Sequence, residues 1–294
     1  MSVTAGARWA FEAIGVPWSV ETPDPLPEPV RTAVSERIER FDRAWSRFRD
    51  DSLVSRMARE PGTWSLPPEA VPLLGVYERL HAVTGGRISP LVGDRLAALG
   101  YDGSYRLGPA SAPAPVVAWA DALAWDGERL TMLRPATLDV GAAGKGLLVD
   151  LVGEVLAAHG LPDSVIDASG DLRIRGRGTG RPERVALEHP DDPARAVAAV
   201  TLRSGALCGS AGNRRAWAGV HHILDAVTGE PTRAVAATWA IADSALVADG
   251  AATALFFVEG AAIAAALGER IEWVRLWADG RLERSAGIEG ELFA

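Results

Sequence analysis

Cysteine and lysine are nearly missing from this chain of 294 residues. Its single cysteine, Cys208, excludes a disulfide within the chain, and we expect this residue to be a small buried side chain. Lys145 is the only lysine among 30 basic residues, and all the others are arginine. Because a chain that otherwise uses arginine keeps one lysine inside a Gly/Ala segment, an ammonium group is indicated at that position.

Long apolar runs are missing as well, and so is an excess of positive charge. No run of about 18 apolar residues could span a membrane, and the N-terminus lacks the apolar stretch of a signal peptide. The formal net charge is −8, and an acidic surface repels the phosphates of nucleic acids. We therefore expect a cytoplasmic protein with no membrane span and no nucleic-acid partner.

Apolar side chains are plentiful, at 48 % of the residues, and their spacing predicts the secondary structure. Helices are predicted over residues 29–48, 68–83, 89–99, 147–160 and 245–258. Strand-like patterns lie at residues 9–20, 123–138, 164–168, 172–175, 185–207, 221–225 and 236–242. Because these elements are clustered rather than strictly alternating, they favour an α+β fold with a largely antiparallel sheet core and flanking helices. We expect a single domain over residues 6–290, with a surface excursion at residues 100–115.

A segment rich in glycine and alanine, residues 139–146 (DVGAAGKG), leads into the predicted helix over 147–160. It does not match a P-loop, because Asp139 and Gly146 stand where that motif requires Gly and Ser or Thr. Backbone N–H groups at the start of a helix could still face an anion, with Lys145 adding a positive charge. A helix-entry turn with a solvated lysine explains the segment equally well.

Asp249 and Thr253 lie in the most apolar of the predicted helices, 245–258. Their spacing of four residues directs both side chains to the same face of the helix. A carboxylate in apolar surroundings requires a partner, and a carboxylate, a hydroxyl and a backbone carbonyl together suit Mg²⁺. The alternative is an aspartate that interacts favourably with the helix dipole, beside a threonine that fills the core.

Six segments along the chain carry a further signal. They are residues 46–57 (SRFRDDSLVSRM), 84–93 (TGGRISPLVG), 139–146 (DVGAAGKG, followed by Asp150), 169–171 (SGD), 222–231 (HILDAVTGEP) and 248–254 (ADGAATA). In this order, over roughly residues 9–260, they resemble the ApbE family of flavin transferases. The resemblance implies an ApbE-like fold. It also implies a transferase that attaches FMN from FAD, through a phosphoester bond, to a Thr or Ser of a client protein and releases AMP.

The same resemblance implies roles for individual residues. Mg²⁺ would be bound by the side chains of Asp249 and Thr253 and by the backbone carbonyl of Ala142. His222 and Asp249 would be catalytic, with His222 as the candidate base for the proton of the client's hydroxyl. Contacts with FAD are implied for Ile14, Phe48, Arg87, Ile88, Ser89, Asp139, Lys145, Ile223 and Leu224.

The chain departs from the family pattern at several positions. Ser89 stands where the family has aspartate, so a hydroxyl can hydrogen-bond FAD but brings no charge.

A Mg²⁺-dependent FAD pyrophosphatase, in which water replaces the client hydroxyl, fits the same residues. A non-catalytic flavin-binding protein stays open because of Ser89. A structural α+β domain with no ligand would leave Lys145 and Asp249 unexplained.

Overall fold

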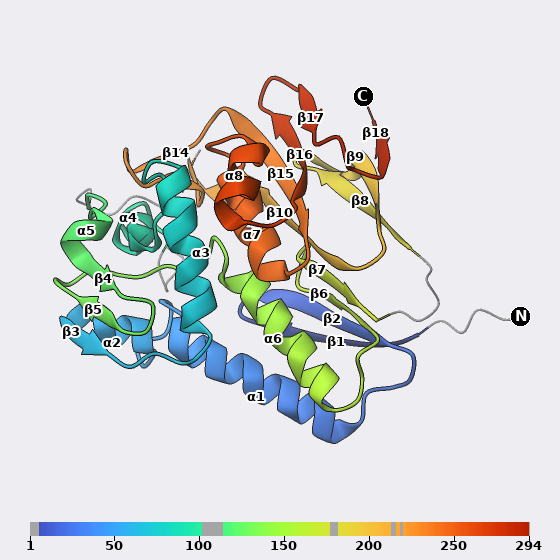
Figure 1. Cartoon of the computed structure of the whole chain (residues 1–294), viewed down its shortest axis with the longest axis horizontal. Coiled ribbons are helices and arrows are strands. Elements are labelled where there is room, and N and C mark those ends of the chain that lie inside the picture. Colours follow the sequence, from blue (N-terminus) through green and yellow to red (C-terminus); the bar gives the residue numbers. More distant parts are fainter. Residues whose placement is uncertain (1–5, 102–113, 177–181, 213–215, 218–219, 294) are drawn as a thin grey trace, which may run out of the picture.

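The computed structural model describes residues 6–101, 114–176, 182–212, 216–217 and 220–293. Its centre is an eight-stranded sheet in which every neighbouring pair is antiparallel, in the order β1-β2-β6-β7-β10-β15-β16-β17 (Figure 1). These strands are β1 (Ala7–Ala13), β2 (Val16–Thr22), β6 (Ser164–Asp167), β7 (Leu172–Arg175), β10 (Gly205–Ala211), β15 (Val235–Ala242), β16 (Glu272–Trp277) and β17 (Leu282–Arg284). The predicted α+β fold with an antiparallel core is confirmed. The excursion expected at residues 100–115 lies mostly outside the described residues.

The central sheet is buried on both faces. In β10, Ala206 and Cys208 belong to the larger core on the helical side, whereas Leu207 belongs to a second core. This alternation follows from the two-residue period of a strand. The second core is closed by a three-stranded sheet of β8 (Glu183–His189), β9 (Asp192–Leu202) and β18 (Gly290–Leu292).

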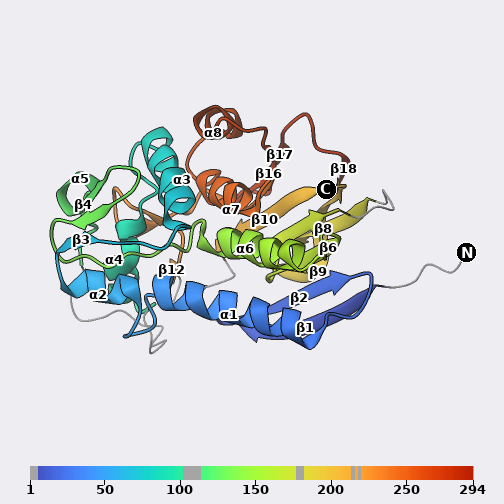
Figure 2. The same ribbon diagram turned by 60° about the horizontal axis from the view of Figure 1, so that its bottom comes forward.

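Helices α1, α6 and α7 lie side by side over the helical face of the sheet (Figure 2). α6 packs against α1 on one side and α7 on the other, and α7 also contacts α3, β10 and β15. The helices are α1 (Glu28–Trp45), α2 (Leu53–Arg59), α3 (Ala70–Val83), the 3₁₀ helix η1 (Pro90–Val92), α4 (Gly93–Ala98), α5 (Trp119–Ala122), α6 (Gly144–Ala158), α7 (Ala245–Ala254) and α8 (Gly260–Leu267). None of the helices within the described residues is long and apolar enough to cross a membrane.

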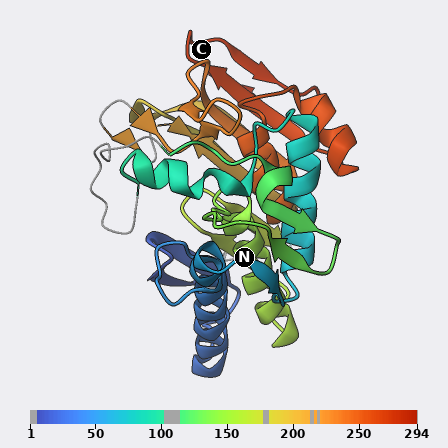
Figure 3. The ribbon, with the colours of Figure 1, turned by 90° about the vertical axis from the view of Figure 1, so that its left-hand side faces the viewer.

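Smaller pairings complete the fold, some of them at the end that faces the viewer in Figure 3. They are β3 (Gly62–Trp64) with β4 (Leu123–Trp125) and β5 (Leu130–Met132), β11 (Ala216–Trp217) with β12 (Val220–His221), and β13 (Leu224–Asp225) with β14 (Glu230–Pro231). The hairpin predicted over 123–138 ends at Met132, shortly before Pro135, which cannot donate to a strand ladder. The single strand predicted over 221–225 is instead divided between β12 and β13.

Candidate active site

A pocket opens where segments that are far apart in the sequence meet near the C-terminal end of α7. Its walls are formed by Tyr77, Arg87, Ile88, Ser89, Val92, Leu96, Tyr101, Asp139, Gly141, Ala142, Ser210, His222, Ile223, Leu224, Thr253 and Phe257. Nine residues that the sequence predicts for the site are therefore brought together: Arg87, Ile88, Ser89, Asp139, Ala142, His222, Ile223, Leu224 and Thr253.

Two side chains fix the first turn of α7, whose N–H groups have no acceptor within the helix. Ser244 caps the helix as predicted, because its Oγ accepts a hydrogen bond from the Val247 N–H at 3.2 Å. The buried Asp150 carboxylate of α6 accepts from the N–H groups of Ala245 and Leu246, at 2.9 and 3.0 Å. These caps set the direction of α7 and hence the position of Thr253 near its other end.

Two of the three predicted metal ligands, Thr253 and Ala142, are in contact where α7 approaches the start of α6, whereas the third, Asp249, lies outside the pocket lining. The Thr253 hydroxyl donates to the Ala142 carbonyl oxygen at 3.2 Å. One turn earlier, Asp249 is 4 % exposed, and its Oδ2 accepts from the Gly146 N–H at 2.8 Å. Carboxylate, hydroxyl and carbonyl oxygens are hard donors that fit Mg²⁺. No group of three His, Cys, Asp or Glu side chains that could hold a metal occurs in the described part of the chain, so the hydroxyl and the carbonyl are essential to this donor set.

The segment that carries Arg87, Ile88 and Ser89 is folded by its own side chains. The Thr84 hydroxyl donates to the Leu80 carbonyl at 2.7 Å and accepts from the Ile88 N–H at 3.1 Å. Ser89 Oγ accepts from the Leu91 N–H at 3.2 Å and so caps η1. Because serine and aspartate are comparable helix caps, Ser89 can fulfil the capping role of an aspartate without its charge.

His222 and the two residues after it also line the pocket. Their segment is joined to the Arg87 segment by a hydrogen bond from the Ala226 N–H to the Arg87 carbonyl, at 2.9 Å. The neighbouring His221 has a different environment, since its Nε2 lies 2.6 Å from the Thr232 carbonyl oxygen. Burial lowers the pKa of His221. His222 is therefore the histidine of this pair that lines the pocket.

Lys145 is engaged away from the pocket wall. Its Nζ lies 2.8 Å from Asp171 Oδ2 and donates to the Ala168 carbonyl at 2.9 Å. Burial disfavours the ammonium, but the carboxylates of Asp171 and Asp249 outweigh this effect and raise the pKa of Lys145. Lys145 does not belong to the pocket lining, and its contact with FAD stays a prediction.

Ile14 and Phe48 also lie outside the pocket lining. Ile14, with a positive φ of 46°, forms the turn between β1 and β2 and lines a separate hollow against α1. The Phe48 ring packs edge-on against the ring of Tyr101, a lining residue, with 5.3 Å between the centroids. The contacts of Ile14 and Phe48 with FAD likewise stay predictions.

Sequence reasoning missed several lining residues, among them Tyr77, Ser210 and Phe257. Tyr77 lies three residues from Leu80 at a helical spacing that indicates only a core position, and it is indeed 1 % exposed. Ser210 lies in a strand, and its Oγ is 3.4 Å from Thr253 Oγ1. No local pattern in the sequence marks either residue.

The sequence and the fold can now be compared with those of known proteins. A sequence model of the ApbE family matches residues 14–274, which is most of the chain. The chain belongs to the ApbE family. A FAD:protein FMN transferase from Rhodobacter capsulatus is 37 % identical over 123 residues, which are 40 % of this chain and only 23 % of that protein. One from Klebsiella pneumoniae (strain 342) is 26 % identical over 273 residues, covering 86 % of this chain and 76 % of that protein.

Solved structures of ApbE proteins share the fold. The ApbE protein of Thermotoga maritima MSB8 superposes with a TM-score of 0.80 at 23 % identity, covering 96 % of this chain and 97 % of that chain. The apo form of the Pseudomonas stutzeri flavinyl transferase ApbE gives a TM-score of 0.78 at 23 % identity, with coverage of 97 % and 98 %. The ApbE-like fold that the sequence motifs predicted is therefore confirmed.

Proposed function

We propose that this ApbE-family protein is a Mg²⁺-dependent FAD:protein FMN transferase that attaches FMN to a Thr or Ser of a client protein and releases AMP. The observation that carries the proposal is the 3.2 Å contact between the Thr253 hydroxyl and the Ala142 carbonyl, in the pocket wall and one helical turn from Asp249. The curated relatives that are named FAD:protein FMN transferases support FAD as the substrate.

The donor set favours a magnesium ion. Asp249, Thr253 and the Ala142 carbonyl would hold Mg²⁺, which polarises phosphate oxygens and offsets the charge that develops on a departing AMP. A carboxylate as buried as that of Asp249 is costly without compensation. The hydrogen bond from the Gly146 N–H offsets part of the cost of burying the Asp249 carboxylate, and a cation bound to this carboxylate would offset a further part.

The remaining pocket residues would bind and orient the substrates. Within the pocket, FAD would contact Arg87, Ile88 and Ser89 of one segment, Ile223 and Leu224 of another, and Asp139. The oxygen of the client's hydroxyl forms a bond to the FMN-side phosphorus while the bond from that phosphorus to AMP breaks. AMP leaves with the electron pair, and His222 accepts the proton of the hydroxyl. Such a transfer depends mainly on positioning and on charge stabilisation.

The test is incubation of the purified protein with FAD and Mg²⁺, with and without a protein that a characterised relative flavinylates. AMP release and the mass of the client would be measured. We expect the client to gain the mass of a covalent FMN, and EDTA should abolish the gain. AMP and free FMN without labelling would favour the pyrophosphatase. FAD that binds but is not cleaved would favour a binding protein, and absence of FAD binding would overturn the proposal.

Variants of the donor set provide the second part of the test. Asp249→Asn removes the charge and Thr253→Val removes the hydroxyl, each with little change of shape, so both should reduce transfer to the background rate. Thr63→Val is a matched control, because the Thr63 hydroxyl is bonded only to the Thr131 hydroxyl among the described contacts, on a small peripheral sheet. Full activity of Asp249→Asn would remove Asp249 from the metal site.

A further inference from the structure

The loop from Asp139 to Ala142 is held in place by side chains from other parts of the chain. The Asp139 carboxylate binds in two directions: Oδ1 accepts from the Gly141 N–H at 2.7 Å, and Oδ2 accepts from Arg47 Nε at 2.5 Å. The backbone N–H of Asp139 also donates to the Pro90 carbonyl at 2.7 Å. Asp139 lines the pocket, and these three hydrogen bonds show that it also holds its own loop in place.

Arg47 is a fixed partner for this carboxylate. Its side chain is only 4 % exposed, and its guanidinium carbon lies 4.3 Å from the ring centroid of Phe48 and 4.9 Å from that of Tyr101. Stacking on two rings restricts the rotation of the guanidinium and is favourable for a cation. Among the described residues, Arg47 forms its ion pair with Asp139. Arg47 thus directs its charge at one side of the loop.

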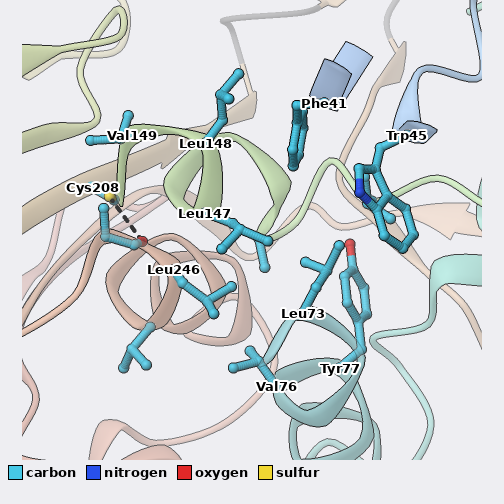
Figure 4. Close-up of a cluster of buried hydrophobic side chains, with 14 of the residues drawn as sticks. Phe41, Trp45, Leu73, Val76, Tyr77, Leu147, Leu148, Val149, Cys208 and Leu246 are labelled. Carbon is cyan, nitrogen blue, oxygen red and sulfur yellow. Dashed lines mark hydrogen bonds between the residues drawn. The ribbon is translucent and has the colours of Figure 1, made fainter. Parts of the chain in front are cut away.

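Tyr77 holds the other side of the same loop. The hydroxyl of this buried residue of α3 accepts from the Ala142 N–H at 3.1 Å and lies 3.4 Å from the Asp139 carbonyl oxygen, to which it donates. In Figure 4 the hydroxyl points away from α3 and toward the start of α6.

Both ends of Ala142 are consequently fixed. Its N–H is bound by Tyr77, and its carbonyl oxygen accepts from Thr253. We propose that Arg47 and Tyr77 are positioning residues of the metal site, which hold the 139–142 loop so that the Ala142 carbonyl faces Thr253 and the ion. This inference rests on the metal site of the proposed function, and the two residues act through Ala142 rather than as ligands.

The variants are chosen to leave the core filled. Tyr77→Phe removes one hydroxyl and keeps the ring. Arg47→Met removes the charge and the bond to Asp139, whereas Arg47→Lys keeps a charge and should retain part of the effect. Arg49→Lys is the matched control, because Arg49 is a neighbouring arginine whose ion pairs are with Glu39, Asp42 and Asp51 and not with the loop.

The measurement is the affinity of the FAD-free protein for Mn²⁺, followed by the electron paramagnetic resonance signal of the free ion, with urea unfolding as the check on folding. Residues that orient a metal ligand typically contribute 10- to 100-fold to metal affinity, so Tyr77→Phe and Arg47→Met should weaken binding by about 10-fold or more. Arg47→Lys should lie between Arg47→Met and the wild type, and Arg49→Lys should match the wild type.

The outcomes separate this inference from the function on which it rests. Folded Tyr77→Phe and Arg47→Met variants that bind Mn²⁺ as tightly as the wild type would overturn the positioning role and leave the metal site intact. A wild-type protein that does not bind Mn²⁺ would overturn the metal site, and the positioning role with it. If Arg47→Met does not fold, the comparison of Tyr77→Phe with the wild type decides.

Discussion

Replacement of Gly146 by alanine tests whether the crossing of α6 and α7 builds the site. A Cβ atom at Gly146 would overlap the carbonyl oxygen of Ala245 and would lie 2.6 Å from Asp249 Cβ. The obstructing carbonyl is backbone in the first turn of α7, so it cannot rotate away like the end of a flexible side chain. The helices would have to separate, and the bond from the Gly146 N–H to the Asp249 carboxylate would lengthen or break.

The expected cost follows from these two effects. Inserting a methyl group into a well-packed core typically costs about 1–3 kcal/mol. Losing a hydrogen bond to a buried charged group costs about 1.5–3 kcal/mol. The higher helix propensity of alanine returns about 1 kcal/mol. We therefore expect the free energy of unfolding to fall by about 3 kcal/mol.

The assay is urea unfolding of Gly146→Ala and of Gly75→Ala, the matched control. Gly75 is also in a helix, α3, but a Cβ there would meet nothing within 4 Å. Gly75→Ala should raise the free energy of unfolding by about 0.5–1 kcal/mol, because glycine loses more backbone entropy on folding. Equal or greater stability of Gly146→Ala than of the wild type would refute the argument about the helix crossing.

Two further predictions concern buried groups. Lys145→Met leaves the fully buried Asp171 carboxylate without its ammonium partner and should lower the free energy of unfolding by about 3 kcal/mol, measured in urea. Because the pKa of Lys145 is raised above its ordinary 10.5, the contribution of the pair is fully present below pH 10.5 and is lost only as pH rises through the higher folded value. The difference from the wild type should therefore stay constant between pH 7 and 9, and a decrease in that interval would contradict the assignment. Burial, and next the charge of Asp171, raise the pKa of the Cys208 thiol well above its ordinary value. The reagent 5,5′-dithiobis(2-nitrobenzoate) should therefore label no thiol in the native protein and one thiol after denaturation. Rapid labelling of the native protein would show that Cys208 is accessible.

Helices of this fold can be predicted from the sequence where a periodic apolar pattern continues for several turns. α1 and α3 lie within a few residues of their predicted ranges, because apolar residues such as Val34, Ile38 and Phe41 repeat at the helical period and are buried together. The pattern does not predict β16 to β18: β16 pairs with β15 and β18 pairs with β9, both distant in the sequence, and β17 is added to the sheet by pairing with β16. Strand pairing over such distances has no local signature.

The candidate site was predictable in part, for a similar reason. Motifs identified the segments that meet at the pocket, and the Asp249–Thr253 spacing placed two oxygen donors on α7. The motifs could not indicate which side chains of a segment face a ligand. Lys145 follows a glycine-rich turn, as an anion-binding lysine would, yet its Nζ is bound by Asp171, which lies beyond the end of the next strand.

That contact also explains why the chain keeps one lysine among so many arginines. The three N–H donors of a lysine ammonium share one nitrogen atom, so its charge is compact. The donors of an arginine guanidinium are spread over a wider planar group. Here two acceptors, the Ala168 carbonyl and Asp171 Oδ2, lie 2.9 and 2.8 Å from the same nitrogen atom. The adjacent residue, Gly146, lies where α6 and α7 approach so closely that even a Cβ has no room. A guanidinium would need a wider cavity beside that crossing, so the packing at residue 145 favours the smaller cation.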